Sequence, residues 1–245
     1  MNTIDNLIRR ARMYSGLVIF LYVTVHLVNH STGLISLEAM EGLRQRVSAF
    51  NRHIIVTAIL YTALLVHALL GFQHLMTRRS FKMSVKDWIQ LVTSFILPLA
   101  LLPHMLASSY APRFKDTQAN YKLVLDGTLE DGGIYFMGLF VIFVWVHGII
   151  GITSMVKFHP VYQKYKNAFL VMSWLLPILA VLGAFTASKE LATGIENNKI
   201  SMAQVYAASN IGKDLEAELM QTSDMLMLNY LYVLLAVTLF VFVVH

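Results

Sequence analysis

Apolar residues gather in six long runs, which are separated by shorter polar segments. A hydrocarbon core about 30 Å thick needs about 20 apolar residues for each helix that crosses it. The six runs cover residues 14–36, 53–77, 88–110, 134–157, 167–188 and 225–245. They lack the strict alternation of barrel strands, and only helices or closed barrels satisfy backbone groups in lipid. We therefore predict an all-α polytopic membrane protein with six transmembrane helices in one bundle.

No repeat, flexible linker or low-complexity tract divides the sequence, which indicates a single membrane domain over residues 1–245. The first run follows Arg9, Arg10 and Arg12, as the apolar region of a signal peptide would, but no small-residue cleavage site comes after it. We expect it to be a retained helix. The partly amphipathic stretch 200–222 leaves two readings open, a helix lying on the outer membrane surface and an external loop.

Composition and charge support a membrane protein and narrow its chemistry. Hydrophobic residues make up 57% of the chain and charged residues 13%, and the mean hydropathy is +0.61. The absence of cysteine excludes disulfides, thiolate metal sites, iron–sulfur clusters and covalently attached c haem. The basic residues lie beside the apolar runs, so we expect anionic lipid headgroups rather than nucleic acid as their partner. They are densest in segments 1–14, 78–87 and 157–166, which predicts a cytoplasmic N-terminus.

Four successive predicted helices each carry one histidine deep in apolar sequence. With a rise of about 1.5 Å per residue, His26 and His104 lie roughly 16 and 24 Å from the inner end of their helices. His67 and His147 lie on helices of the opposite direction, about 10 Å from the inner face. The four histidines therefore form an outer pair and an inner pair.

Paired imidazoles at two depths favour two stacked b haems, because each haem iron can take one imidazole on either face. Small residues follow three of the histidines by four positions, at Gly71, Ser108 and Gly151, and would leave room for a porphyrin edge. Zinc or copper would need three or four ligands at one level, which the depths do not provide. The simpler alternative is that each neutral imidazole hydrogen-bonds a neighbouring helix.

Other polar residues near the histidine pairs are secondary candidates for cofactor binding. His30 shares a helix face with His26 and could contact a haem propionate or replace His26 as ligand. His74, Arg78 and Arg79 at the inner end of the second run could hold the inner propionates, or simply extend to the membrane interface. No phosphate-binding loop, nucleophile motif, zinc-protease motif or catalytic carboxylate pair is present, so we expect no catalytic site within these residues.

The order of the four histidines, spaced 41, 37 and 43 residues apart, resembles the dihaem cytochrome b subunits of succinate dehydrogenase and fumarate reductase. In the single-chain form of that family, the first and third histidines hold one haem and the second and fourth hold the other. Carried over, this pairs His26 with His104 and His67 with His147. A sixth helix and the segment 189–224 depart from the five-helix pattern of that family.

A closer resemblance covers almost the whole chain. The stretches are "HLVNHSTGLISLEAMEGLR" (26–44), "LYTALLVHALLG" (60–71), "MSVKDWIQLVTSFILPLALLPHML" (83–106) and "VHGIIGI" (146–152). They resemble the six-helix membrane anchor of bacterial class III adenylate cyclases, in which a cytochrome-b-like domain precedes a cytoplasmic cyclase.

This second resemblance implies a bacterial inner-membrane protein with two b haems, a bound quinone, and a cyclase domain in cis after residue 245. It also implies a homodimer, because class III cyclase sites form between two catalytic domains. The expected function is then a quinone- or redox-sensing receptor that regulates the conversion of ATP to cyclic AMP. The alternative is an electron-transfer subunit of a succinate dehydrogenase or fumarate reductase complex.

Overall fold

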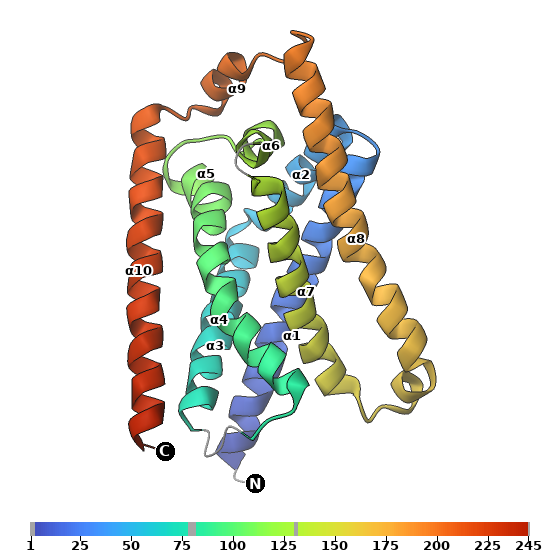
Figure 1. Cartoon of the computed structure of the whole chain (residues 1–245), viewed down its shortest axis with the longest axis vertical. Coiled ribbons are helices and arrows are strands. Elements are labelled where there is room, and N and C mark those ends of the chain that lie inside the picture. Colours follow the sequence, from blue (N-terminus) through green and yellow to red (C-terminus); the bar gives the residue numbers. More distant parts are fainter. Residues whose placement is uncertain (1–2, 78–81, 130–131, 245) are drawn as a thin grey trace.

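The computed structural model describes residues 3–77, 82–129 and 132–244, and this part of the chain is helical and contains no strand. Six helices are long and apolar enough to cross a membrane, which confirms the predicted all-α fold and the number of spans. They are α1 (Thr3–Ser31), α3 (Ile54–Met76), α4 (Val85–Met105), α7 (Gly133–Val156), α8 (Pro160–Glu196) and α10 (Lys213–Val244). Figure 1 shows them side by side, with α10 and α8 at opposite edges and both chain ends at the same end of the bundle.

Shorter helices connect the long ones at the other end of the bundle (Figure 1). They are η1 (Thr32–Leu34), α2 (Leu37–Asn51), the π-helical turn η2 (Leu106–Tyr110), α5 (Ala111–Phe114), α6 (Tyr121–Leu129) and α9 (Met202–Ser209). The Oγ atom of Ser36 caps α2 by accepting a hydrogen bond from the N–H of Ala39 at 3.0 Å. Following the predicted orientation, we call η1, α2, α6 and the adjoining part of α8 the outer cap.

Several helices extend beyond the predicted apolar runs. The last one begins at Lys213 rather than 225, and α8 covers 37 residues where 167–188 was predicted. The stretch 200–222 forms neither one surface helix nor one loop, because it is divided between α9, a turn and the first part of α10. Hydropathy detects the part of a helix inside hydrocarbon, whereas backbone hydrogen bonding continues into polar sequence outside it.

The outer cap has a packed core of its own. Its buried residues are Leu37, Met40, Tyr121, Leu125, Ala184, Ala187 and Leu191. The Glu190 carboxylate accepts a hydrogen bond from the N–H of Leu37 at 2.7 Å, and Glu41 accepts one from the N–H of Tyr121 at 3.0 Å. Burial alone would raise the pKa of Glu41, but hydrogen bonds from Arg44 and from the Tyr121 N–H, with the Arg44 charge, lower it overall. An ionised carboxylate therefore joins α2 to α6.

The outer cap is fixed to the bundle where α8 crosses the end of α1 and η1 with almost no space between backbones. A Cβ atom added to Gly183 would lie 2.2 Å from the carbonyl oxygen of His30, and one added to Gly33 would lie 2.3 Å from that of Gly183. Neither position can accept a side chain unless the two elements separate, so glycine is required at both.

The four helices with deep histidines form two close pairs. Helix α1 packs closely on α3, and α4 packs on α7. The contact between α1 and α7 is smaller, and α3 and α4 make no extensive backbone contact. We call the boundary between the α1/α3 pair and the α4/α7 pair the seam.

The crossing of α8 and η1 gives the first prediction. Gly183→Ala should lower the free energy of unfolding by about 1–3 kcal/mol, because the new methyl group overlaps a backbone carbonyl that cannot move independently. Unfolding in mixed detergent micelles measures this change. Gly42→Ala is the control, since nothing lies within 4 Å of a Cβ at that position; equal stability of the two variants would contradict the close approach.

Candidate functional site

The inner pair consists of His67 on α3 and His147 on α7, which face each other across the seam. Their ring centroids are 6.2 Å apart and the ring planes meet at 83°. Both side chains are partly buried. The two residues that sequence depth assigned to one level are therefore neighbours in space.

Helix α1 holds the ring of His67. Its Nδ1 atom lies 3.1 Å from the carbonyl oxygen of Arg12 and 3.5 Å from Oγ of Ser15. A carbonyl oxygen can only accept, so Nδ1 carries the proton and Nε2 retains a lone pair. The ring fits against α1 because residue 16 is glycine: a Cβ there would lie 2.8 Å from Cε1 of His67.

His147 has the same tautomer for a different reason. Its Nδ1 atom lies 3.1 Å from Oγ1 of Thr93, whose hydroxyl donates to the carbonyl oxygen of Ile89 at 2.7 Å and so accepts from Nδ1–H. The side-chain amide nitrogen of Gln90 lies 3.3 Å from Nε2 of His147 and donates to its lone pair. Both inner histidines thus carry the proton on Nδ1 and the lone pair on Nε2, and a metal bound to Nε2 of His147 would replace the hydrogen bond from Gln90.

The outer pair consists of His26 on α1 and His104 on α4, with ring centroids 5.7 Å apart and planes at 67°. Nε2 of His30 lies 3.1 Å from Nε2 of His26, and its ring lies 5.6 Å from that of Tyr121. Tyr22 stacks on His26 at 6.1 Å. The structure therefore puts His26 beside His104, and makes His30 the link between this pair and the outer cap.

A buried polar contact continues this link into the outer cap. The side-chain amide of Asn29 donates to the Tyr121 hydroxyl at 2.8 Å, while Oδ1 of Asn29 is buried without a hydrogen-bond partner in the described chain. Burial raises the pKa of the Tyr121 phenol, and the hydrogen bond from Asn29 offsets only part of this effect. Tyr121 therefore keeps its proton at neutral pH.

The two pairs fit a planar metal cofactor with two axial imidazoles. Metal–imidazole bonds are about 2.0–2.1 Å long, so the ring centres of two imidazoles on opposite sides of one metal lie about 6 Å apart. Both pairs have this spacing. A Cβ added to Gly151, which is partly buried one helical turn from His147, would have no atom within 4 Å; the same holds for Gly71, which is exposed on the surface of α3. Among the described residues, no group of three or more His, Cys, Asp or Glu side chains could hold a metal ion alone.

The other predicted site residues are less well placed. His74 lies in the last turn of α3 and is exposed. Arg78 and Arg79 lie outside the described residues, so their proposed contact with the inner propionates stays a prediction. Ser108 is exposed, and its hydroxyl donates back to the carbonyl oxygen of His104 at 2.6 Å.

The structure also identifies residues that the sequence interpretation missed. Gln90 and Thr93 are three residues apart in an apolar run, and this polar pair on one helix face was a usable signal. Gly16 and the Arg12 carbonyl gave no such signal, because their role depends on which helix lies beside His67.

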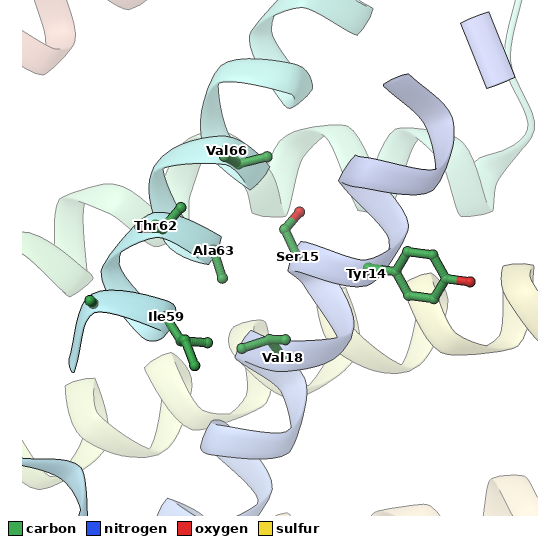
Figure 2. Close-up of a pocket in the computed structure, with 8 residues that line it drawn as sticks. Tyr14, Ser15, Val18, Ile59, Thr62, Ala63 and Val66 are labelled. Carbon is green, nitrogen blue, oxygen red and sulfur yellow. The ribbon is translucent and has the colours of Figure 1, made fainter. Parts of the chain in front are cut away.

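A shallow hollow of about 410 Å³ lies between α1 and α3, close to the inner pair. Figure 2 shows Val18 of α1 facing Ile59 and Ala63 of α3 across it, and Tyr14 pointing away from α3. Ser15, which lines this hollow, also approaches Nδ1 of His67. The hollow contains no charged side chain and has an apolar lining, as expected for a surface covered by lipid tails.

Comparison with protein-family models, curated protein sequences and solved structures gave no match. The resemblance to dihaem cytochrome b subunits and cyclase anchors therefore stays a prediction from sequence motifs.

Proposed function

We propose that the chain is a membrane cytochrome b domain that binds two b haems, one between His26 and His104 and one between His67 and His147. This proposal rests on the two pairs of imidazole rings, in each of which one ring faces the other across the seam. In the inner pair, the Nδ1 contacts leave Nε2 as the nitrogen that can bind a metal. A haem, when bound, supplies a one-electron redox centre.

The surrounding residues orient and tune the histidines. The Arg12 carbonyl and the Thr93 hydroxyl accept the Nδ1–H bonds, which fixes the rotation of each inner ring and raises the basicity of Nε2. In the outer pair the contact between His30 and His26 joins the two Nε2 atoms, so a haem iron bound to Nε2 of His26 would replace it. Phe20 and Trp145 pack between α1 and α7 with ring centroids 5.1 Å apart, and so exclude water from the core of the bundle.

We further propose that the domain senses the quinone pool and regulates a cyclase in a homodimer in the inner membrane. Support comes from the place of α10, which packs on α3 and α4 and thus on one ligand helix of each pair (Figure 1). The Tyr230 hydroxyl of α10 donates to the carbonyl oxygen of Phe95 on α4 at 3.0 Å. A shift of α4 would reach α10, which in the resembling family leads to the cyclase. The alternative is an electron-transfer subunit of a succinate dehydrogenase or fumarate reductase complex.

The haem content tests the first proposal. Pyridine haemochrome analysis of the purified chain should give two b haems per chain. His26→Ala and His104→Ala should each remove one spectral component, and His67→Ala and His147→Ala should each remove the other. His159→Ala, an exposed position before α8, serves as the control and should retain both.

Two results would contradict this assignment. One is a ratio of one haem or none in a folded wild-type chain. The other is loss of the same component from both His26→Ala and His67→Ala.

The hydrogen bond to Nδ1 of His147 gives a further prediction. Thr93→Val keeps the shape of the side chain but removes the acceptor, so the inner haem should bind about 10- to 100-fold more weakly. Transfer of haem to apomyoglobin measures this loss. Ser94→Ala is the control, since its hydroxyl bonds only the carbonyl oxygen of Leu91. Equal transfer rates for the two variants would remove Thr93 from the site.

The regulatory proposal is tested with the chain joined to its cyclase domain in membranes. Cyclic AMP synthesis should differ between a reduced and an oxidised quinone pool. Tyr230→Phe should reduce this ratio by about fivefold, because a hydrogen bond worth about 1 kcal/mol is lost from the coupling. Tyr232→Phe, at an exposed position on the same helix, should not reduce it. Equal rates in both redox states, with both haems present and changing oxidation state, would favour the electron-transfer alternative.

A further inference from the structure

A second hollow, of about 330 Å³, opens near the outer end of the bundle between α3, the α4–η2–α5 segment and α10. We call it the outer groove. Its wall is apolar along Leu102, Met105 and Leu226, and its polar end is formed by Tyr61 and Arg113. An apolar groove with a cation at one end is complementary to an amphiphile, which has an apolar chain and an anionic head.

The groove depends on a local change of helix type. Pro112 has no N–H to donate to the carbonyl of Ser108, and its ring would press against that carbonyl in a regular α-helix. The chain instead forms the π-helical turn η2, in which the N–H of Ala111 donates to the carbonyl of Leu106. Such turns are frequent at functional sites. Here the wider turn places Ser109 where it meets side chains from α3 and α5.

Some of the N–H groups of Arg113 donate hydrogen bonds that hold the guanidinium in place, and the others have no acceptor among the described residues. Nη1 donates to the carbonyl oxygen of Ser109 at 3.0 Å and to its Oγ, and Nη2 lies 3.4 Å from the carbonyl oxygen of Asn51. Oγ of Ser109 is also 2.6 Å from the Tyr61 hydroxyl. No acceptor for Nε–H and no carboxylate within 4 Å of Arg113 occurs in residues 3–77, 82–129 and 132–244.

Nε–H and one N–H of Nη2 have no acceptor among the described residues, and guanidinium N–H groups are the donors that bind a phosphate through charge-assisted hydrogen bonds. Arg113 lies at the end of the apolar span Val85–Phe114, so we expect it at the depth where headgroups meet the hydrocarbon. A zwitterionic headgroup brings its own cation beside the phosphate, whereas an anionic headgroup has a net negative charge that neutralises Arg113 in a partly apolar setting.

We propose that the outer groove binds an anionic phospholipid, with its phosphate on Arg113 and one acyl chain along Leu102, Met105 and Leu226. This proposal does not depend on haem binding. The bound lipid fills the space between α10 and the rest of the bundle at its outer end. It therefore stabilises the packing of α10 against α3 and α4.

The test measures thermal unfolding of the purified full chain in neutral detergent with added lipid. Phosphatidylglycerol at about 100 times its Kd should raise Tm by about 5–10 °C. Phosphatidylcholine should give a much smaller shift, and inorganic phosphate, which lacks a tail, should give none. Native mass spectrometry should show one phosphatidylglycerol retained per chain.

Two variants separate the headgroup from the tail. Arg113→Gln should abolish the rise in Tm with phosphatidylglycerol, because the headgroup loses its cation. Leu226→Trp should also abolish it, because the indole fills the outer groove while Arg113 is kept. Arg52→Gln removes an exposed positive charge just after α2 and should leave the shift unchanged. Because each shift is measured against the same variant without lipid, loss of basal stability does not imitate loss of binding.

Three outcomes would overturn the proposal. They are an equal shift with phosphatidylcholine, an undiminished shift in both Arg113→Gln and Leu226→Trp, and a shift produced by a short-chain quinone but not by phosphatidylglycerol.

Discussion

An imidazole ring in hydrocarbon must have its N–H paired within the protein, because no water is present to accept it. In the inner pair this requirement is met by the Arg12 carbonyl for His67 and by the Thr93 hydroxyl for His147. Both bonds engage Nδ1 and leave the lone pair on Nε2. The requirement to satisfy a buried donor thus also decides which nitrogen keeps its lone pair. Helix α1 supplies the acceptor for His67 and also carries His26, the proposed outer ligand.

The helix backbones approach one another more closely at the outer end of the bundle than across the seam. The glycine contact between α8 and η1 and the packed outer cap fix the helices at one end. The seam is different, because α3 and α4 make no extensive backbone contact there. Histidines that face each other across such a seam keep their positions only if the helices are held elsewhere, and the outer cap holds them.

The sequence was sufficient for the spans and for the vertical order of the histidines, because the bilayer thickness and the helical rise convert residue number into depth. The sequence alone could not predict which residues of neighbouring helices contact each other. Gly16 is required only because His67 lies on it, and Thr93 matters only because α7 is the helix beside it. The outer cap was missed for another reason: α2 and α6 are stabilised by packing on α8 and carry no apolar run of membrane length.

All four deep histidines precede the end of α7 at Val156, and this order along the chain has a consequence for biogenesis. Membrane helices insert individually and associate afterwards, and chains emerge from the N-terminus at about 5–20 residues per second. Both histidine pairs can therefore meet on the order of 10 s before α10 has been synthesised. The two halves of the seam can close while the bundle still lacks its last helix, so α10 is added to a core that is already assembled.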